Sequence, residues 1–111
     1  MNTTSLSPSV TAYLRLSEGP DKTSAIDVFT PDAVVTDDGS THRGRSAVLD
    51  WLAGTASAFT YSTTLLAAKE SDGVAVVSSL IEGDFPGGRA TLQSRFELAP
   101  DGLIRSLTIS A

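Results

Sequence analysis

The chain has 111 residues, 41% of them hydrophobic and 19% charged, which fits one globular domain and excludes a disordered segment. Its 8 basic and 13 acidic residues give a net charge of −5, which argues against a nucleic-acid partner because phosphate binding uses clustered basic side chains. The absence of cysteine excludes disulfides, thiolate metal sites and thiol nucleophiles.

The N-terminal residues and the apolar runs bear on where the protein works. Residues 1–5 have neither the basic nor the apolar region of a secretory signal peptide. No apolar run approaches the roughly 20 residues of a membrane span. We therefore expect a cytoplasmic protein with no membrane partner.

Helical spacing of apolar residues marks the first part of the chain. Ser7-Pro8 has the form of a helix start, a hydroxyl N-cap followed by proline. Val10 and Tyr13 then share one face, and the pattern predicts a first helix to about residue 17. A second short helix is expected after an N-cap at Asp21, with Phe29 inward, and it ends before Pro31 because proline disfavours helical geometry in the residue before it.

The next segment is predicted to form two short strands and then a helix. A β-branched run predicts a short strand at 33–37, a turn at 38–40 and a second short strand at 41–43. Gly44 interrupts this pattern. Trp51 and its apolar neighbours then recur at helical spacing, which predicts a third helix over about 46–57.

After this helix the period of the pattern becomes two. Three joints between the alternating segments carry glycine, and each is short enough for an antiparallel hairpin. The segment at 89–98 alternates most cleanly, with Leu92, Ser94 and Phe96 facing one way. The four expected strands are residues 59–69, 74–84, 89–98 and 103–110.

These elements follow the order ααββαββββ in a single domain over residues 1–111. The last four strands have no crossover helices between them, so a doubly wound parallel sheet is excluded. Long twisted strands curl. We predict an α+β fold in which three helices pack on a curved antiparallel sheet and form a cone with one open end.

Motifs for metals and cofactors are missing. The single histidine excludes any site with two histidine ligands, and the phosphate-loop and dinucleotide fingerprints do not occur. Asp37 and Asp38 are adjacent in a strand, so their side chains point to opposite faces and would chelate poorly. We expect neither a metal nor a cofactor.

One group of polar residues is predicted to converge on the hollow of the cone. If Val35 faces the interior, the period of two places Asp37 on the same face. Tyr13 lies on the inward stripe of the first helix, and Ser94 lies on the inward face of a central strand. A carboxylate in an apolar hollow has general-base potential, and a phenol can hydrogen-bond a carbonyl that gains charge. The same residues also have ordinary structural uses, in a turn or in the core.

Other side chains are expected around the same hollow. His42 is a candidate from the neighbouring short strand, although a surface position near the turn is the alternative. The aromatic candidates for the core or the pocket lining are Phe29, Trp51 and Phe96.

The sequence resembles the nuclear transport factor 2-like superfamily, in its SnoaL-like and ketosteroid-isomerase-like branch. The resemblance covers nearly the whole chain, and the matching segments are Tyr13-Leu14, residues 29–39, residues 43–51, residues 83–88 and residues 96–104. It implies that Asp37 stands at the general-base position of the ketosteroid isomerases and Tyr13 at the phenolic donor, with a matching interval. Ser94 then stands where those enzymes have a protonated aspartic acid as second donor.

Three functions stay open at this level. The first is a cofactor-free isomerase or cyclase in which Asp37 moves a proton beside a carbonyl of an apolar substrate. The second is a non-catalytic module that binds a small hydrophobic ligand. The third is a dimeric interaction domain. A homodimer through the outer face of the sheet is expected in any case, with Arg95 and Glu97 bridging the two-fold axis.

Overall fold

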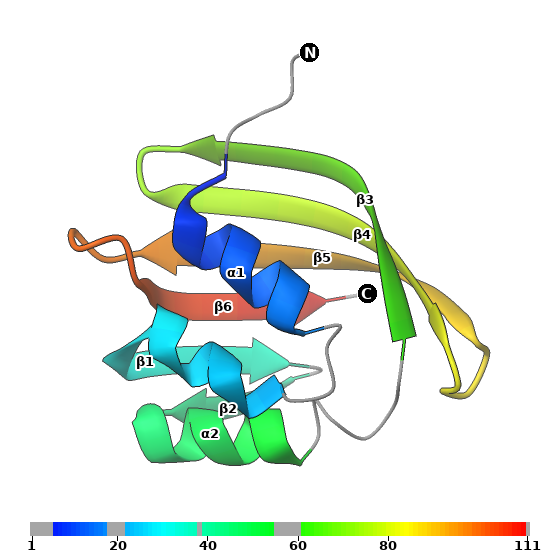
Figure 1. Cartoon of the computed structure of the whole chain (residues 1–111), viewed down its shortest axis with the longest axis horizontal. Coiled ribbons are helices and arrows are strands. Elements are labelled where there is room, and N and C mark those ends of the chain that lie inside the picture. The colour runs from blue at the N-terminus through cyan, green and yellow to red at the C-terminus, as the bar shows by residue number, and fades with distance from the viewer. Residues whose placement is uncertain (1–5, 18–21, 38, 55–60, 111) are drawn as a thin grey trace.

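The computed structural model describes residues 6–17, 22–37, 39–54 and 61–110. Figure 1 shows the helical segments of the described ranges beside one sheet. The order of elements matches the prediction. They are α1 (Pro8–Leu16), the 3₁₀ helix η1 (Lys22–Val28), β1 (Phe29–Asp37), β2 (Ser40–Arg43), α2 (Arg45–Ala53), β3 (Tyr61–Ser71), β4 (Val74–Gly83), β5 (Arg89–Leu98) and β6 (Ile104–Ser110).

The six strands form one sheet in the order β2-β1-β6-β5-β4-β3. The α+β fold class is confirmed. One detail differs, because β1 and β6 pair in parallel while the remaining neighbours are antiparallel. The sheet is therefore mixed. Hairpin rules predict only pairs that are close in sequence, whereas β1 and β6 come from opposite ends of the chain.

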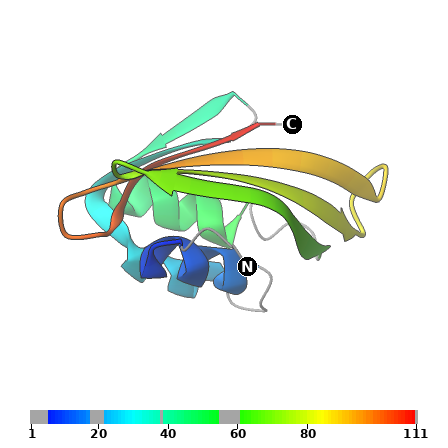
Figure 2. The ribbon, with the colours of Figure 1, turned by 90° about the horizontal axis from the view of Figure 1, so that it is seen from above.

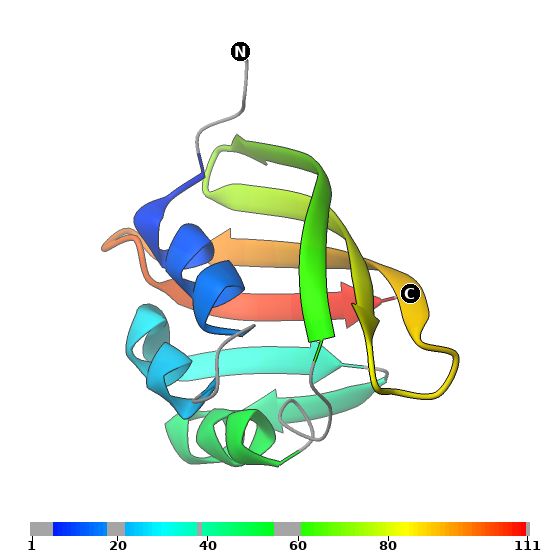
Figure 3. The same ribbon diagram turned by 45° about the vertical axis from the view of Figure 1, so that its right-hand side comes forward.

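The helices all lie on one face of the sheet. Figure 2 shows the sheet as a curved layer with α1, η1 and α2 beneath it, and Figure 3 shows β3 and β4 bending around that side. Of the residues that the structure describes, fifteen buried hydrophobic ones form the core between the two layers, among them Val10, Phe29, Val35, Phe96 and Leu107. No helix in the described ranges has the length and apolar character needed to cross a membrane.

The second helix and the strand after it depart from the prediction. Lys22–Val28 forms a 3₁₀ helix, and β1 begins already at Phe29, four residues earlier than expected. Phe29 pairs with Ile104, and the register then shifts before Val34. Pro31 lies inside this irregularity, where the missing backbone donor is tolerated. Phe29 is buried as predicted, but it is a strand residue.

The N-terminus of α1 is held by a distant carboxylate. Pro8 is the first helical residue as predicted, but the Ser7 hydroxyl does not cap the helix. The Ser7 backbone N–H donates to Glu70 Oε1 at 2.7 Å, and its hydroxyl donates to the other oxygen of the same carboxylate. The start of α1 is therefore fixed to β3.

Some predicted features lie outside the described residues. These are the N-cap at Asp21, the turn residue Asp38, the end of the third helix at Ser57 and the start of a strand at Phe59. Within the described ranges, α2 ends at Ala53.

Candidate functional site

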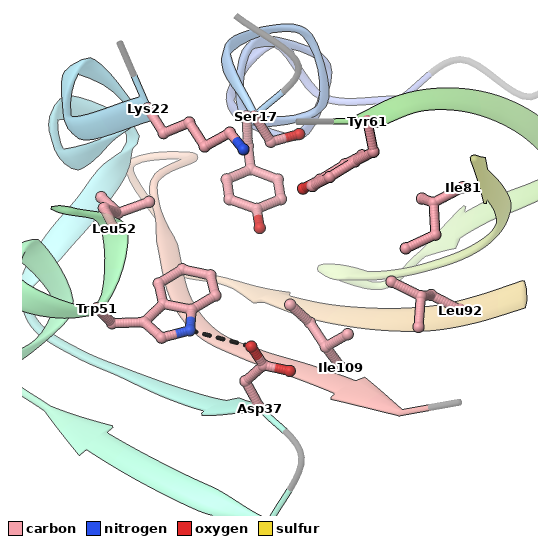
Figure 4. A pocket seen from close by; sticks show the side chains of 10 residues that line it. Ser17, Lys22, Asp37, Trp51, Leu52, Tyr61, Ile81, Leu92 and Ile109 are labelled. Atoms are coloured by element: carbon pink, nitrogen blue, oxygen red, sulfur yellow. Dashed lines mark hydrogen bonds between the residues drawn. The ribbon is translucent and has the colours of Figure 1, made fainter. Parts of the chain in front are cut away.

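A pocket opens between the helices and the concave face of the sheet. Its space is about 590 Å³, counting the part open to solvent. Apolar side chains from α2 and strands β4, β5 and β6 form much of the wall (Figure 4). The lining residues are Tyr13, Ser17, Lys22, Asp37, Trp51, Leu52, Tyr61, Ile81, Leu92 and Ile109.

Asp37 lies in this pocket, at the end of β1. Val35 is fully buried, and the strand period brings Asp37 to the same side, as the sequence predicted. The indole N–H of Trp51 donates to Asp37 Oδ2 at 3.1 Å (Figure 4). This bond orients the carboxylate and engages one of its two oxygens. The other oxygen, Oδ1, is thus the better placed of the two to receive a ligand proton.

Trp51 and His42 have different positions relative to the pocket. Trp51 is 3% exposed and lines the pocket. His42 pairs with Val35 and is partly buried; its ring lies 6.2 Å from the Trp51 ring between centroids. The described pocket lining includes Trp51 but not His42. A role for His42 at the pocket therefore stays a prediction, and its observed contact is the one with the indole.

Tyr13 lines the pocket and is packed by two phenylalanines. Its ring meets Phe29 and Phe96 edge-on, with centroids 5.8 and 5.6 Å apart. These two residues were expected around the hollow, but they are core residues behind Tyr13 and not part of the lining. Burial raises the pKa of the Tyr13 hydroxyl far above its ordinary value, and the neighbouring Tyr61 and Asp37 raise it further. The hydroxyl therefore keeps its proton and can donate.

A second recess continues from the same pocket along the sheet. It has about 360 Å³ of space and shares Tyr13, Ser17 and Tyr61 with the first, together with apolar residues of β4, β5 and β6. Ser94 is 9% exposed and lines this recess, beside other hydroxyls from Thr63 and Ser79. Tyr13 belongs to both spaces, so it connects the Asp37 end of the cavity with the Ser94 end.

Sequence reasoning missed Lys22 and Tyr61, which both line the pocket. Lys22 is the only charged side chain among the buried residues of the described ranges, at 7% exposure. Its Nζ lies 4.5 Å from the centre of the Tyr61 ring. The two residues come from η1 and β3, which are far apart in sequence. In the sequence, Lys22 follows closely after a glycine-proline pair, where a lysine is ordinarily a surface residue. No local pattern therefore predicts that Lys22 and Tyr61 come together.

Ligands for a metal do not gather in the part of the chain that is described: no group of three acidic, histidine or cysteine side chains lies close together there. The pocket instead presents one carboxylate, one ammonium group and several hydroxyls on an otherwise apolar wall. Such a set can bind an apolar molecule, hydrogen-bond its carbonyl and exchange a proton with it.

The fold is of the nuclear transport factor 2-like type. Residues 10–107 match the SnoaL-like domain family, and the chain belongs to that family. The predicted resemblance is thereby confirmed. No curated protein matches the sequence.

Solved structures with the same fold include proteins from several bacteria. A Sinorhizobium meliloti protein named as a candidate polyketide cyclase is 32% identical, with a TM-score of 0.85 and 95% of each chain covered. A Catenulispora acidiphila protein with a ketosteroid-isomerase-like fold, bound to trimethylamine, is 18% identical with a TM-score of 0.82, covering 96% of this chain and 87% of that one. The Mycobacterium tuberculosis protein RV0760c, in complex with estradiol-17beta-hemisuccinate, is 17% identical with a TM-score of 0.78. The match covers 96% of this chain and 95% of that one.

Proposed function

We propose that this domain is a cofactor-free enzyme that moves a proton beside a carbonyl of an apolar substrate, as an isomerase or cyclase does. One observation carries the proposal. The Asp37 carboxylate and the Tyr13 hydroxyl line the same mostly apolar pocket. A proton acceptor and a hydrogen-bond donor that reach one ligand are the minimum set for forming and collapsing an enolate.

Asp37 is the proposed base. Its Oδ2 accepts the Trp51 N–H, so the carboxylate is held in one orientation. Its other oxygen takes a proton from the carbon next to the carbonyl; the C–H electron pair forms a carbon–carbon double bond, and the π pair of the carbonyl moves to its oxygen. In a β,γ-unsaturated substrate, return of the proton to the γ carbon of the dienolate completes an isomerisation. Attack of the enolate carbon on a second carbonyl, with the proton returned from Asp37 to the new alkoxide, completes a cyclisation.

Tyr13 and Ser94 are the proposed donors to the carbonyl oxygen. Both line the second recess, and Tyr13 also lines the space next to Asp37. The raised pKa of Tyr13 keeps it a donor rather than a phenolate. A serine hydroxyl is a weaker acid than a carboxylic acid, so Ser94 contributes orientation more than charge stabilisation.

The named relatives point to the same substrate class. One is named as a candidate polyketide cyclase, and another was solved with a steroid derivative. Both names concern rigid, mostly apolar, oxygen-bearing molecules. A mostly apolar lining with a few polar groups is the type of wall that suits such a molecule.

Hydrogen–deuterium exchange tests the chemistry without knowledge of the natural substrate. A β,γ-unsaturated ketosteroid and a bicyclic aromatic ketone are incubated in D₂O with the protein, and exchange beside the carbonyl is followed by NMR. Asp37→Asn should keep the fold and abolish exchange, because an amide does not accept a proton at neutral pH. Tyr13→Phe should slow exchange by about 10²–10³.

Asp32→Asn is the matched control, because Asp32 lies on the same strand as Asp37 but is exposed to solvent. This variant should catalyse exchange of the ketone probes at the wild-type rate. Exchange that survives Asp37→Asn would overturn the proposed base.

Non-catalytic binding is the second candidate. It is favoured by the hydrogen bond from Trp51, which gives Asp37 a structural role that needs no catalysis. Binding of the probes without Asp37-dependent exchange would establish this function instead.

A homodimer is part of the proposal. On β4 the buried Ala75 and Val77 face the helices, so Val74 and Val76 lie on the uncovered outer face. Arg95 hydrogen-bonds Glu97 within its own chain, and a bridge across a two-fold axis would have to add to this bond. The cytoplasmic location expected from the sequence stays a prediction.

A further inference from the structure

Ser79 and Ser94 line the second recess and have no hydrogen-bond partner for their side chains among the described residues. Ser79, on β4, is 5% exposed, and Ser94, on β5, is 9% exposed. Their oxygens are not sealed off from the recess, since Thr30 Oγ1 is the only fully buried side-chain atom without a partner in the described ranges. Buried hydroxyls ordinarily bond to the protein or to water, so both are available to a molecule in the recess.

The pairing of β4 with β5 sets the spacing of the two hydroxyls. Ser79 pairs with Leu92, and Ser94 pairs with Val77, so the two serines are diagonal neighbours on the concave face. Diagonal neighbours in an antiparallel pair lie about 7–8 Å apart. This spacing suits two ligand oxygens that are one ring apart better than a single oxygen. Because Ser94 is already a proposed donor to the reacting carbonyl, Ser79 is left for a second oxygen.

The wall between Asp37 and Ser79 is continuous. Ile81 follows Ser79 on the same face of β4, and Leu92 is the partner of Ser79 on β5. Both apolar side chains line the Asp37 pocket as well as the second recess (Figure 4). A ligand that covers them therefore has one end at Asp37 and the other at Ser79.

We propose that Ser79 is a specificity-determining residue, whose hydroxyl binds a hydroxyl group that the ligand carries beyond its reacting carbonyl. This deepens the proposed function and rests on it, because the carbonyl takes the donors Tyr13 and Ser94. A serine can donate and accept a hydrogen bond, and a ligand hydroxyl can do the same. The substrate class is thereby narrowed from apolar ketones to ketones with a hydroxyl at the end away from Asp37.

Loss of water makes this contact selective. A ligand that fills the recess excludes water from Ser79, whose side chain is already almost fully buried. An apolar ring over the hydroxyl leaves it without any partner, and an unpaired buried polar group costs free energy. A ligand hydroxyl takes the place of the water. A site of this kind rejects the analogue that lacks the hydroxyl.

The test compares α-tetralone with its three phenolic derivatives in which the ring hydroxyl is not next to the ketone. All four compounds share the ketone and the bicyclic body. Dissociation constants are measured by NMR titration of the protein at about pH 6, where phenols keep their proton. At least one derivative should bind about threefold to tenfold more tightly than α-tetralone, which is the gain from one net hydrogen bond. If no derivative gains affinity, the proposal is overturned, and this comparison needs no variant.

Ser79→Ala then assigns the gain to one residue. The preference for the hydroxylated ketone should disappear, and urea denaturation should show an intact fold, because no side-chain hydrogen bond within the described ranges is lost. Ser78→Ala is the matched control, since Ser78 is the preceding residue of β4 and is not among the described residues that line either space. It should keep the full preference.

Two results with Ser79→Ala would refute the assignment. One is a preference that survives the substitution. The other is an equal loss of affinity for all four ketones, because Ser79 would then meet the carbonyl that they share.

The same ketones report on catalysis through exchange of the protons beside the carbonyl in D₂O. Asp37-dependent exchange without a Ser79-dependent preference means that the Ser79 inference fails and the proposed function stands. A Ser79-dependent preference without exchange means that the hydroxyl site stands and the proposed catalysis fails. The two failures are therefore distinguishable in one set of samples.

Discussion

Replacement of Trp51 tests the pocket and its most informative hydrogen bond together. The indole is 3% exposed, and its N–H donates to Asp37 at 3.1 Å. A buried aromatic side chain removes about 150–250 Å² from water, worth about 4–6 kcal/mol at 25 cal/mol per Å². Because one side of the ring already faces the pocket, we expect Trp51→Ala to cost about 3–5 kcal/mol of unfolding free energy.

Trp51→Phe separates the hydrogen bond from the packing. It keeps a buried ring but removes the donor, and a hydrogen bond to a charged acceptor is worth about 1.5–3 kcal/mol. Asp37 is only partly buried, so water can replace the lost donor, and the lower end of that range is expected. In a double-mutant cycle with Asp37→Asn, the two residues should show a coupling of at least about 0.5 kcal/mol.

Urea denaturation followed by far-ultraviolet circular dichroism is the appropriate assay. Trp51 is the only tryptophan of the chain, so its fluorescence is lost with the substitution. A cost below about 1 kcal/mol for Trp51→Ala, or an easily quenched, red-shifted emission in the wild type, would refute the buried position. Additivity in the cycle would show that the bond to Asp37 does not contribute in solution.

Three further predictions concern the rest of the molecule. Folding raises the pKa of Tyr13 above its value near 10 in the unfolded chain, so above pH 10 the folded chain retains a proton that the unfolded chain has lost. The free energy of unfolding should therefore fall by about 1.4 kcal/mol for each pH unit above 10. Urea titrations at several pH values should show this slope, and Tyr13→Phe should remove it. Gly73 has φ +78° in the β3–β4 turn, so Gly73→Ala should cost about 1–2 kcal/mol, whereas Asp72→Asn should be nearly neutral by the same measurement. Sedimentation at micromolar concentration should give the mass of a dimer, and Val76→Lys on the outer face should shift it to the monomer; a monomeric wild type would refute the proposed interface.

Much of the secondary structure follows from local patterns in the sequence. Pro8 sets the first helical residue, and alternation predicts the whole extent of β5 at residues 89–98. The inward positions of Val35, Ser94 and Phe96 follow from the same period of two, because neighbouring strand residues face opposite sides. The burial of Tyr13 likewise follows from its place on the apolar stripe of α1.

The errors lie where a contact with a distant segment overrides the local pattern. Phe29 has the spacing of a helical residue, but pairing with Ile104 draws it into β1. Ser7 has the form of an N-cap, but the Glu70 carboxylate takes its hydroxyl. In both cases the competing partner is more than 60 residues away in the chain, beyond the reach of any local pattern.

The sequence by itself determined the fold family, the core faces and the presence of Asp37 and Tyr13 on the concave side, because helix and strand periods decide which side chains turn inward. Only the tertiary structure decided which inward residues reach open space. It packed Phe29 and Phe96 against Tyr13, set His42 beside Trp51, and brought Lys22 over Tyr61 at the pocket wall. Periodicity assigns a face to each side chain, whereas a pocket forms where the packing of η1, α2 and the curved strands leaves that face uncovered.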